Sequence, residues 1–190
     1  MKTKLFLLLM LFGISFFGCD ELEELLEEEI EVQSTFITEL EINVPNGATP
    51  EQAMEFESNF GFWDFTEDPN VVDFLGDPDE ITKIEINSVR YFYKDVVGNP
   101  DAFVEGDIIF AIGQSAEEFE AVVTNLAQAD FNNTLFTLEG DFSQVNAAMT
   151  QFRSVGFLYK GSVSDNPVSF ITDVSITVTV TIKPDLDNIN

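Results

Sequence analysis

The side chains that could carry out catalysis leave few options in this sequence. It contains no histidine and a single cysteine, Cys19. Thiol catalysis, histidine-assisted serine chemistry and the usual zinc sites all depend on these two residue types. A serine–lysine pair or a pair of carboxylates is left open, but the spacing of Lys83, Lys94, Lys160 and the many acids picks out no such pair. We therefore expect a protein that is not an enzyme.

Clustered oxygen ligands could hold calcium, which prefers carboxylate and carbonyl oxygens on loops. Two stretches bring such groups together: Asp64, Glu67, Asp68, Asn70 and Asp73 form one, and Asp185, Asp187 and Asn188 form the other. Neither matches the twelve-residue calcium loop with its central glycine and closing glutamate. Because Asp and Asn also cap helices and form turns, we expect caps and solvated turns here, with no metal and no cofactor.

A run of aromatic residues could form a platform for sugar rings: Phe60, Phe62, Trp63 and Phe65. On a strand, the first two point to one side and the last two to the other, so the four do not share a surface. Core packing is the better interpretation. The few cations among many acids are expected to be ion-paired structural residues: Arg90, Arg153 and Lys160.

The first 18 residues have the parts of a secretory signal. Two lysines open the chain, residues 5–17 are almost entirely apolar, and Gly18 is a small residue before Cys19. The apolar run is shorter than the roughly 20 residues that a spanning helix needs, and acidic residues follow at once. We therefore expect a signal peptide over residues 1–18.

Gly18-Cys19 at the end of this run resembles the lipobox of bacterial lipoproteins, although Phe16 and Phe17 stand where that motif usually has Leu and a small residue. The resemblance implies that Cys19 is the lipid anchor and that several acyl chains hold the protein to a membrane. The alternative is an ordinary secretory signal with an incidental cysteine. An unpaired thiol would, however, be a liability in an oxidising compartment.

Residues 19–32 then form an acidic tether dominated by glutamates. This stretch resembles the export signal that sends lipoproteins of the Bacteroidota type to the outer face of the outer membrane, which implies cell-surface exposure. In other bacteria with an outer membrane, Asp20 directly after the cysteine would instead imply retention at the inner membrane. A block of like charges also serves as a solvated spacer.

The remaining chain, residues 33–190, has the size of a single domain. Its charge contributes to a net −27 for the whole sequence, which repels nucleic acid phosphates and excludes nucleic-acid binding. Hydrophobic residues make up 45% of the sequence, and 20 of them are phenylalanine, so a packed core can form.

Alternation of apolar and polar residues predicts strands at 36–44, 60–66, 81–93, 103–112, 134–138, 157–163 and 168–182. A slip in the alternation between Ile86 and Val89 predicts a bulge. The turn sequence at 98–101 predicts that the strand at 103–112 pairs with the one before it as a hairpin. Residues 51–59 are ambiguous.

Three short helices are predicted from their capping residues. Asp68 followed by proline begins one that stops at Gly76. The capping box Ser115-Ala116-Glu117-Glu118 predicts a helix over 116–128. Asp141 caps a third over 142–152. Together these elements predict a mainly β (β-rich α+β) fold, an antiparallel β-sandwich of jelly-roll type with two or three short helices.

The strand–capped helix–strand layout over residues 63–93 and the final strand with its alternating threonines resemble those of small surface lipoproteins of the Bacteroidota group, a resemblance that implies no particular activity. We expect a non-enzymatic, surface-anchored module that binds an extracellular glycan or protein, or that has a structural role in the envelope. The alternative is a small surface polysaccharide hydrolase that uses a carboxylate pair.

Overall fold

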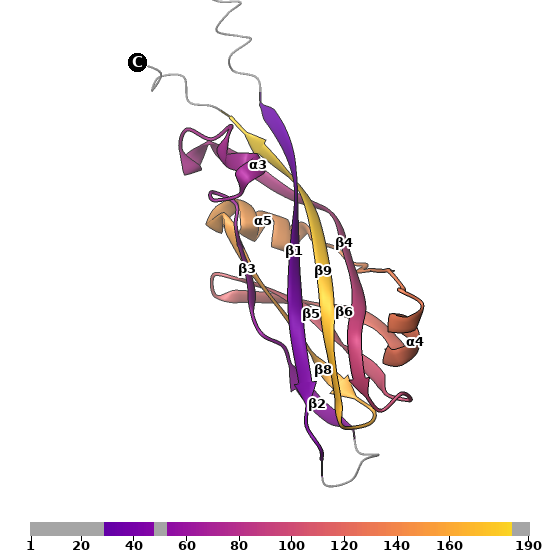
Figure 1. Ribbon diagram of the computed structural model, residues 1–190. Helices are drawn as coiled ribbons and strands as arrows, with labels where there is room; N and C mark the ends of the chain where they lie inside the picture. Colours follow the sequence, from indigo (N-terminus) through magenta and orange to yellow (C-terminus); the bar gives the residue numbers. More distant parts are fainter. Residues whose placement is uncertain (1–28, 48–52, 184–190) are drawn as a thin grey trace, which may run out of the picture.

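The computed structural model describes residues 29–47 and 53–183. Its elements, labelled as in Figure 1, are mostly strands. The strands are β1 (Ile30–Val44), β2 (Met54–Glu57), β3 (Gly61–Asp64), β4 (Ile81–Gly98), β5 (Phe103–Ile112), β6 (Ser115–Asn125), β7 (Phe136–Thr137), β8 (Ser154–Val163) and β9 (Val168–Ile182). The helices are α3 (Pro69–Val72), the 3₁₀ helix η1 (Pro78–Glu80), α4 (Leu126–Phe131) and α5 (Ser143–Phe152).

The strands form two antiparallel sheets packed face to face. One sheet has the order β1-β9-β4-β7 and the other the order β2-β8-β5-β6, with β3 also pairing with β8. The chain crosses from sheet to sheet between β1 and β2, β3 and β4, β4 and β5, β6 and β7, β7 and β8, and β8 and β9. This is the strand order of a jelly roll, so the predicted mainly β sandwich is confirmed.

Regular alternation accounts for the longest pairing in the domain. β1 and β9 pair without interruption from Ile30 opposite Ile182 to Val44 opposite Val168. Along β9, Val174, Ile176, Val178 and Val180 are buried in the core, as the sequence predicts. A fully buried Val or Ile contributes roughly 1.5–3 kcal/mol, so this strand is a main source of stability.

β4 is bent where the sequence predicts it. Its register with β9 shifts between Ile86 and Ser88, and again between Lys94 and Val97. The bend lets one long strand follow the curvature of the sandwich while its alternate residues stay in the core.

The tyrosines join the two layers of the core. The Tyr93 hydroxyl on β4 and the Tyr159 hydroxyl on β8 lie 2.9 Å apart, one from each sheet. Tyr91 accepts a hydrogen bond from the Val122 backbone N–H at 2.6 Å. Burial raises the pKa of Tyr93, Tyr159 and Tyr91 above the usual value of a tyrosine, because the phenolate would lose its hydration.

The helix predicted over 116–128 is wrong, because residues 116–125 belong to strand β6 and only residues 126–128 lie in helix α4. Phe119 and Ala121 are buried while Glu118 and Glu120 are exposed, a period of two. A two-residue turn led by Gly113, whose φ is +60°, folds β6 back on β5. Pairing with β5 overrides the local capping signal, and helix α4 starts only at Leu126.

The predicted hairpin between the strand at 81–93 and that at 103–112 is also wrong. β4 pairs with β9 and β7, whereas β5 pairs with β6 and β8 in the other sheet. The connection after Gly98 crosses the sandwich because both strands bury one face, and these faces meet across the core.

Asp68 caps its helix as predicted, whereas the N-cap of the third helix is Phe142 and Asp141 lies one position before it. Asp68 accepts a hydrogen bond from Asn70 N and caps α3, which ends at Val72 before the predicted stop at Gly76. Asp141 accepts one from Ser143 N at 2.9 Å before α5. That bond lowers the pKa of Asp141, because it stabilises the carboxylate.

Both described ends of the domain leave from the same end of the sandwich, where Ile30 pairs with Ile182 (Figure 1). β1 begins at Ile30, so residues 30–32 of the predicted tether belong to the sheet. The predicted signal peptide and the first part of the tether lie outside the described residues. Within the part of the chain that the structure describes, no helix is long and apolar enough to cross a membrane.

Candidate functional site

The predicted lipid anchor, Cys19, lies outside the described residues, as do Asp185, Asp187 and Asn188 of one predicted oxygen cluster. The other oxygen cluster is described and serves as a set of caps. Asp64 accepts hydrogen bonds from Thr66 N and Oγ1 at 2.9 and 2.7 Å. Among the residues that the structure describes, no group of three or more acidic, cysteine or histidine side chains could hold a metal.

Asp68 is the buried centre of that cluster. Its carboxylate accepts hydrogen bonds from Ser34 Oγ, Trp63 Nε1 and Asn70 N, each at 2.9 Å. Asn70 Nδ2 in turn donates to Ser34 Oγ at 3.1 Å. Asp68 is 7% exposed, so these donors replace the water that the carboxylate gives up. The group fastens α3 to β1 and β3 and has no oxygen available for a ligand.

The predicted split of the aromatic run occurs in the structure. Trp63 and Phe65 are buried, and their rings lie 4.4 Å apart. Phe60 and Phe62 are each 57% exposed, on the other side. The ring of Phe60 lies over Gly156, where a Cβ would come within 1.9 Å of the Phe60 Cζ atom. Two of the four aromatics therefore belong to the core and two to an outer surface.

Most of the cations are ion-paired. Lys83 pairs with Glu85, Arg153 with Asp79 and Lys160 with Glu57, at 2.8, 2.9 and 2.9 Å. Arg90 is exposed and has no ion pair among the described residues.

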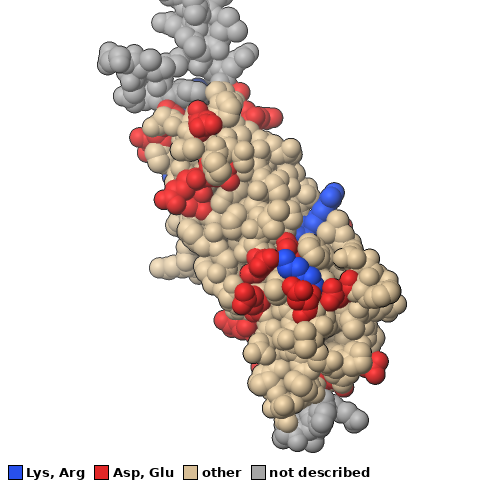
Figure 2. Space-filling model, in the orientation of Figure 1, with Lys and Arg blue, Asp and Glu red and all other residues tan. Residues whose placement is uncertain are grey.

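Lys94 lies between two acids on the outer face of the four-stranded sheet. Its ammonium is 2.5 Å from Glu39 and 2.7 Å from Asp173. Hydrogen bonds to Asp173 and then Glu39 raise the pKa of Lys94 to about 12. Figure 2 views the molecule from this side and shows basic and acidic atoms together near the middle, with further acidic atoms toward the upper end. Lys94 therefore offsets part of the negative charge of Glu39 and Asp173.

The opposite outer face, that of the five-stranded sheet, carries a groove of about 750 Å³. Its walls come from four adjacent strands and contain five carboxylates and one ammonium. The charged residues are Glu55 and Glu57 on β2, Lys160 on β8, Glu105 and Asp107 on β5, and Glu118 on β6. We call this site the acidic groove.

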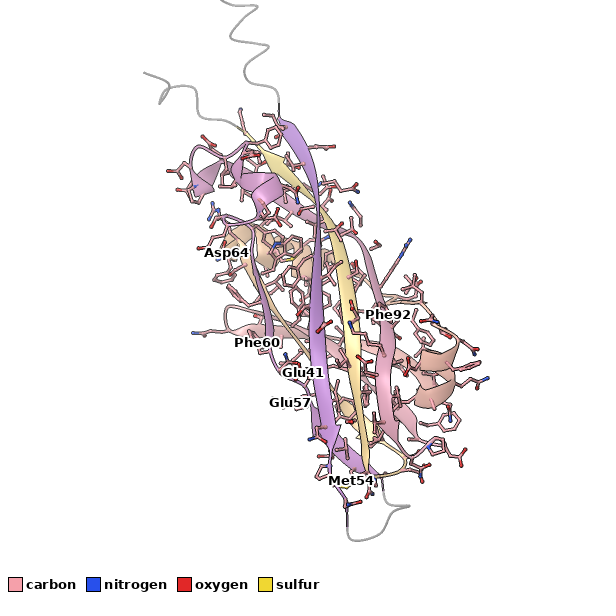
Figure 3. All side chains as sticks on the ribbon, viewed as in Figure 1. Glu41, Met54, Glu57, Phe60, Asp64 and Phe92 are labelled. Atoms are coloured by element: carbon pink, nitrogen blue, oxygen red, sulfur yellow. The ribbon has the colours of Figure 1, made fainter. Side chains whose placement is uncertain are left out.

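The strand register explains why these charges lie together. Glu57 is opposite Lys160, and Lys160 is opposite Asp107 on its other side. One step further along the sheet, Glu105 is opposite Ser162 and Glu55 is opposite the same serine. Alternate residues of antiparallel strands share a face, so polar positions from three strands form one surface. Figure 3 shows Glu57 on β2 with Phe60 just beyond it along the chain.

A pair of glycines lies in the lining of the acidic groove. Gly106 and Gly161 are opposite each other on β5 and β8. A Cβ on Gly106 would come within 2.2 Å of the Lys160 carbonyl oxygen, and a Cβ on Gly161 within 2.2 Å of the Glu105 carbonyl oxygen. Only glycine permits this close approach of two backbones. The register shift between Val104 and Gly106 lies beside it.

Lys160 offsets part of the negative charge of the acidic groove. A hydrogen bond to Glu57 raises the pKa of Lys160, with a further contribution from the charge of Glu118. The ammonium therefore stays charged and leaves an excess of carboxylates on the groove walls. Such a surface attracts cations and repels anions.

The apolar zone next to the acidic groove completes this outer face. Phe62 is opposite Gly156, Gly156 is opposite Ala111, and Ala111 is opposite Ala116. The exposed face thus changes from small and aromatic residues beside β3 to carboxylates beside β2. A ligand on this face would meet apolar contacts and charged hydrogen-bond acceptors together, as is typical of binding sites.

Sequence reasoning missed the acidic groove. Glu55 and Glu57 lie in the stretch 51–59 that was ambiguous, and Glu118 lies in the stretch predicted as a helix. The alternation of acids at 55 and 57, and again at 105 and 107, was a signal that the residues share the outer face of strands. Which strands are neighbours is decided by the jelly-roll crossings, which that alternation does not contain.

Comparison with protein-family models and with curated protein sequences finds no match. Among solved structures, the chain is similar to turnip yellow mosaic virus, with 10% identity over 85% of this chain and 100% of that chain and a TM-score of 0.38. It is also similar to the decameric BFDV capsid protein, with 9% identity over 80% of this chain and 98% of that chain and a TM-score of 0.33. At such low scores these similarities say nothing about function.

Proposed function

We propose that this protein is a non-enzymatic, surface-anchored lipoprotein, and that the acidic groove is its binding face for a cationic group of an extracellular glycan or protein. The observation that supports this most is the gathering of five carboxylates on the walls of one groove. The single lysine among them, Lys160, forms an ion pair with Glu57 alone among the described residues. Charge left without partners on a concave surface is available to a ligand.

The position of the groove on the domain suits a tethered protein. Ile30 and Ile182 lie at one end of the sandwich, and β2, which forms one wall of the groove, lies toward the other end (Figure 1). A lipid on Cys19 and a tether of about a dozen residues would hold the domain up to roughly 40 Å from the membrane. Acidic walls would also be repelled by anionic head groups.

Hydrolysis of a polysaccharide by a carboxylate pair is the competing function. A catalytic acid of a glycosidase is typically a carboxyl in an apolar pocket. Four of the groove carboxylates, Glu55, Glu57, Glu105 and Glu118, are exposed, and only Asp107 is half-buried. The groove therefore has the character of a binding surface more than that of a catalytic pocket.

A binding and turnover screen tests the proposal. The chain with Cys19→Ser is applied to a glycan array and to a set of cationic and neutral peptides, and product release is measured in parallel. The triple variant Glu57→Gln, Glu105→Gln, Asp107→Asn should lose binding at least tenfold. The matched variant Glu31→Gln, Glu41→Gln, Glu67→Gln removes the same charge elsewhere and should bind like the parent. Turnover abolished by Asp107→Asn alone would overturn the non-enzymatic function.

The lipid anchor and the location on the cell surface are tested by separate experiments. Cells that carry the parent chain should incorporate labelled fatty acid into it, and Cys19→Ser should abolish that label and release the protein from the membrane fraction. Protease added to intact cells should digest the domain if it is on the surface. Unchanged labelling in Cys19→Ser would contradict the anchor, and a protected domain would contradict the outer-membrane surface.

A further inference from the structure

The open edge of the five-stranded sheet is strand β6, which pairs on one side only, with β5. Its hairpin with β5 closes with Ile112 opposite Ser115. In a hairpin with a two-residue loop the closing pair exchanges both backbone hydrogen bonds, and the pairs alternate from there. The backbone groups of Ala116, Glu118 and Glu120 therefore point away from β5.

The next backbone amide that points away from β5, that of Val122, has a hydrogen-bond partner, unlike the amides of Ala116, Glu118 and Glu120 among the described residues. Val122 N donates to the Tyr91 hydroxyl at 2.6 Å, which ends the open stretch. Within the described part of the chain, Ala116, Glu118 and Glu120 have no backbone hydrogen-bond partner on this edge. These three residues are also exposed. The open stretch can accept one more strand over about five residues.

Another sheet edge in the molecule is treated differently. On the outer edge of β1, the Asn59 side-chain amide takes the place of a neighbouring strand. Its Oδ1 accepts from Glu41 N at 2.6 Å, and its Nδ2 donates to the Glu39 carbonyl at 3.2 Å. The fold thus closes part of one edge with a side chain and leaves the edge of β6 open.

The negative charges of Glu118 and Glu120 determine which kind of strand can pair with the open edge of β6. Glu118 and Glu120 point to the outer face, where Asp107 is opposite Glu120 and Glu118 also lines the acidic groove. A second copy of β6 would place glutamates beside glutamates, so the edge disfavours self-association. A strand with lysine or arginine opposite Glu118 and Glu120 would instead pair with both.

We propose that β6 is a strand-addition site for an extended basic segment of a polypeptide, with cationic residues at alternate positions opposite Glu118 and Glu120. The residue between the two cations lies opposite Phe119, on the side where the Phe119 and Phe142 rings stack at 4.5 Å. That position suits an apolar side chain. The segment recognised is therefore of the pattern cation–apolar–cation. This inference rests on the proposed function, because it names the partner of the acidic groove.

A set of synthetic peptides tests strand addition. The probe is acetyl-Lys-Val-Lys-Val-Lys-Val-Lys-amide, and its affinity for the Cys19→Ser chain is measured by calorimetry at low salt. Methylation of two lysine backbone nitrogens removes the donors that would bond Glu118 and Glu120, and should weaken binding at least tenfold. Methylation of two valine backbone nitrogens, which would point away from β6, should change the affinity less than twofold. All three peptides carry the same charge.

Charge-reversal variants separate this inference from the proposed function. Glu118→Lys with Glu120→Lys should abolish binding of the probe, whereas Glu41→Lys with Glu67→Lys should weaken it less than threefold. Equal affinity of the three peptides would overturn strand addition and leave electrostatic binding by the groove intact. Failure of the parent peptide to bind, while a ligand from the screen still depends on Glu57, Glu105 and Asp107, would overturn strand addition alone. Loss of that dependence as well would overturn both.

Discussion

Two regions of this domain use carboxylates in opposite ways. Around Asp68, one buried carboxylate accepts hydrogen bonds from three neighbouring residues and fastens a helix to two strands. In the acidic groove, five carboxylates line the same walls as Lys160, which pairs with Glu57 alone among the described residues, and four of the five are exposed. The residue type is the same, so burial and the supply of donors decide its role. A cluster of acids in a sequence therefore identifies a binding site only when the fold shows which hydrogen-bond donors each acid already has.

The largest effect expected from this comparison is on Asp68. Asp68→Ala removes the acceptor for Ser34, Trp63 and the end of α3, and should lower the free energy of unfolding by about 3 kcal/mol. Glu118→Ala should change it by less than about 0.5 kcal/mol, because the side chain is exposed. Urea unfolding followed by fluorescence of Trp63, the single tryptophan, measures both. Equal effects of the two changes would remove the distinction.

The second prediction concerns the contribution of the groove's backbone, as distinct from its charges, to the free energy of unfolding. Gly161→Ala places a Cβ within 2.2 Å of the Glu105 carbonyl oxygen, so β5 and β8 must move apart. We expect a loss of about 2 kcal/mol. The control Ser162→Ala, one residue further along β8, should lie within about 0.5 kcal/mol of the parent. A tolerated Gly161→Ala would show that the strands can separate freely.

The three buried tyrosines make the stability of the domain depend on pH in the alkaline range. All three are buried, and burial raises their pKa above that of the unfolded chain. The neutral form is favoured by the fold, so their contribution is complete below pH 10 and is lost as the pH rises above it. Tyr93 and Tyr159, whose pKa values are raised furthest, should each cost roughly 1.4 kcal/mol of stability by pH 11.

Tyr93→Phe isolates one of these contributions. The variant should lose about 1.4 kcal/mol less than the parent between pH 9 and pH 11. In the parent, absorbance of tyrosinate at alkaline pH should appear only together with unfolding. Tyrosine ionisation in the folded protein near pH 10 would contradict the buried hydroxyl pair between the sheets.

The smallest expected effect concerns a buried polar group without a partner. Thr172 on β9 is fully buried, and its hydroxyl has no hydrogen-bond partner among the described residues. Thr172→Val keeps the shape and removes the hydroxyl, so the free energy of unfolding should rise by up to about 1 kcal/mol. Thr177→Val, on the same strand but facing outward, should leave it nearly unchanged. A clear loss for Thr172→Val would mean that the hydroxyl is bonded.

Much of the fold could be predicted from single strands. The alternation of apolar and polar residues predicted the bounds of β5 and β9 and the bend near Ile86. A strand with one buried face needs an apolar residue at every second position, so its sequence shows this pattern. Strand β6 was wrongly predicted as a helix, because its sequence contains a capping box followed by two valines at helical spacing. There the tertiary contact of Phe119 with the core decided the structure, and local propensity did not.

The candidate site could be predicted far less well. The acidic groove unites β2, β8, β5 and β6, and the strands that meet there are up to about a hundred positions apart in the sequence. Long-range pairing of this kind leaves no local trace. The sequence predicted that Asp68 caps a helix, because an Asp before Pro69 is typical of a helix start. It did not predict the hydrogen bond between Asp68 and Ser34 on β1.

A map of where a cationic ligand binds tests the role of the acidic groove and of β6 together. The isotope-labelled Cys19→Ser chain is titrated with the alternating lysine–valine peptide, and backbone amide shifts are followed by NMR. We expect the largest changes at Glu118 and Glu120 on β6 and along Glu105 and Asp107 on β5, with little change around Lys94 on the opposite face. Largest changes around Lys94, Glu39 and Asp173, or changes spread evenly over the surface, would contradict that role.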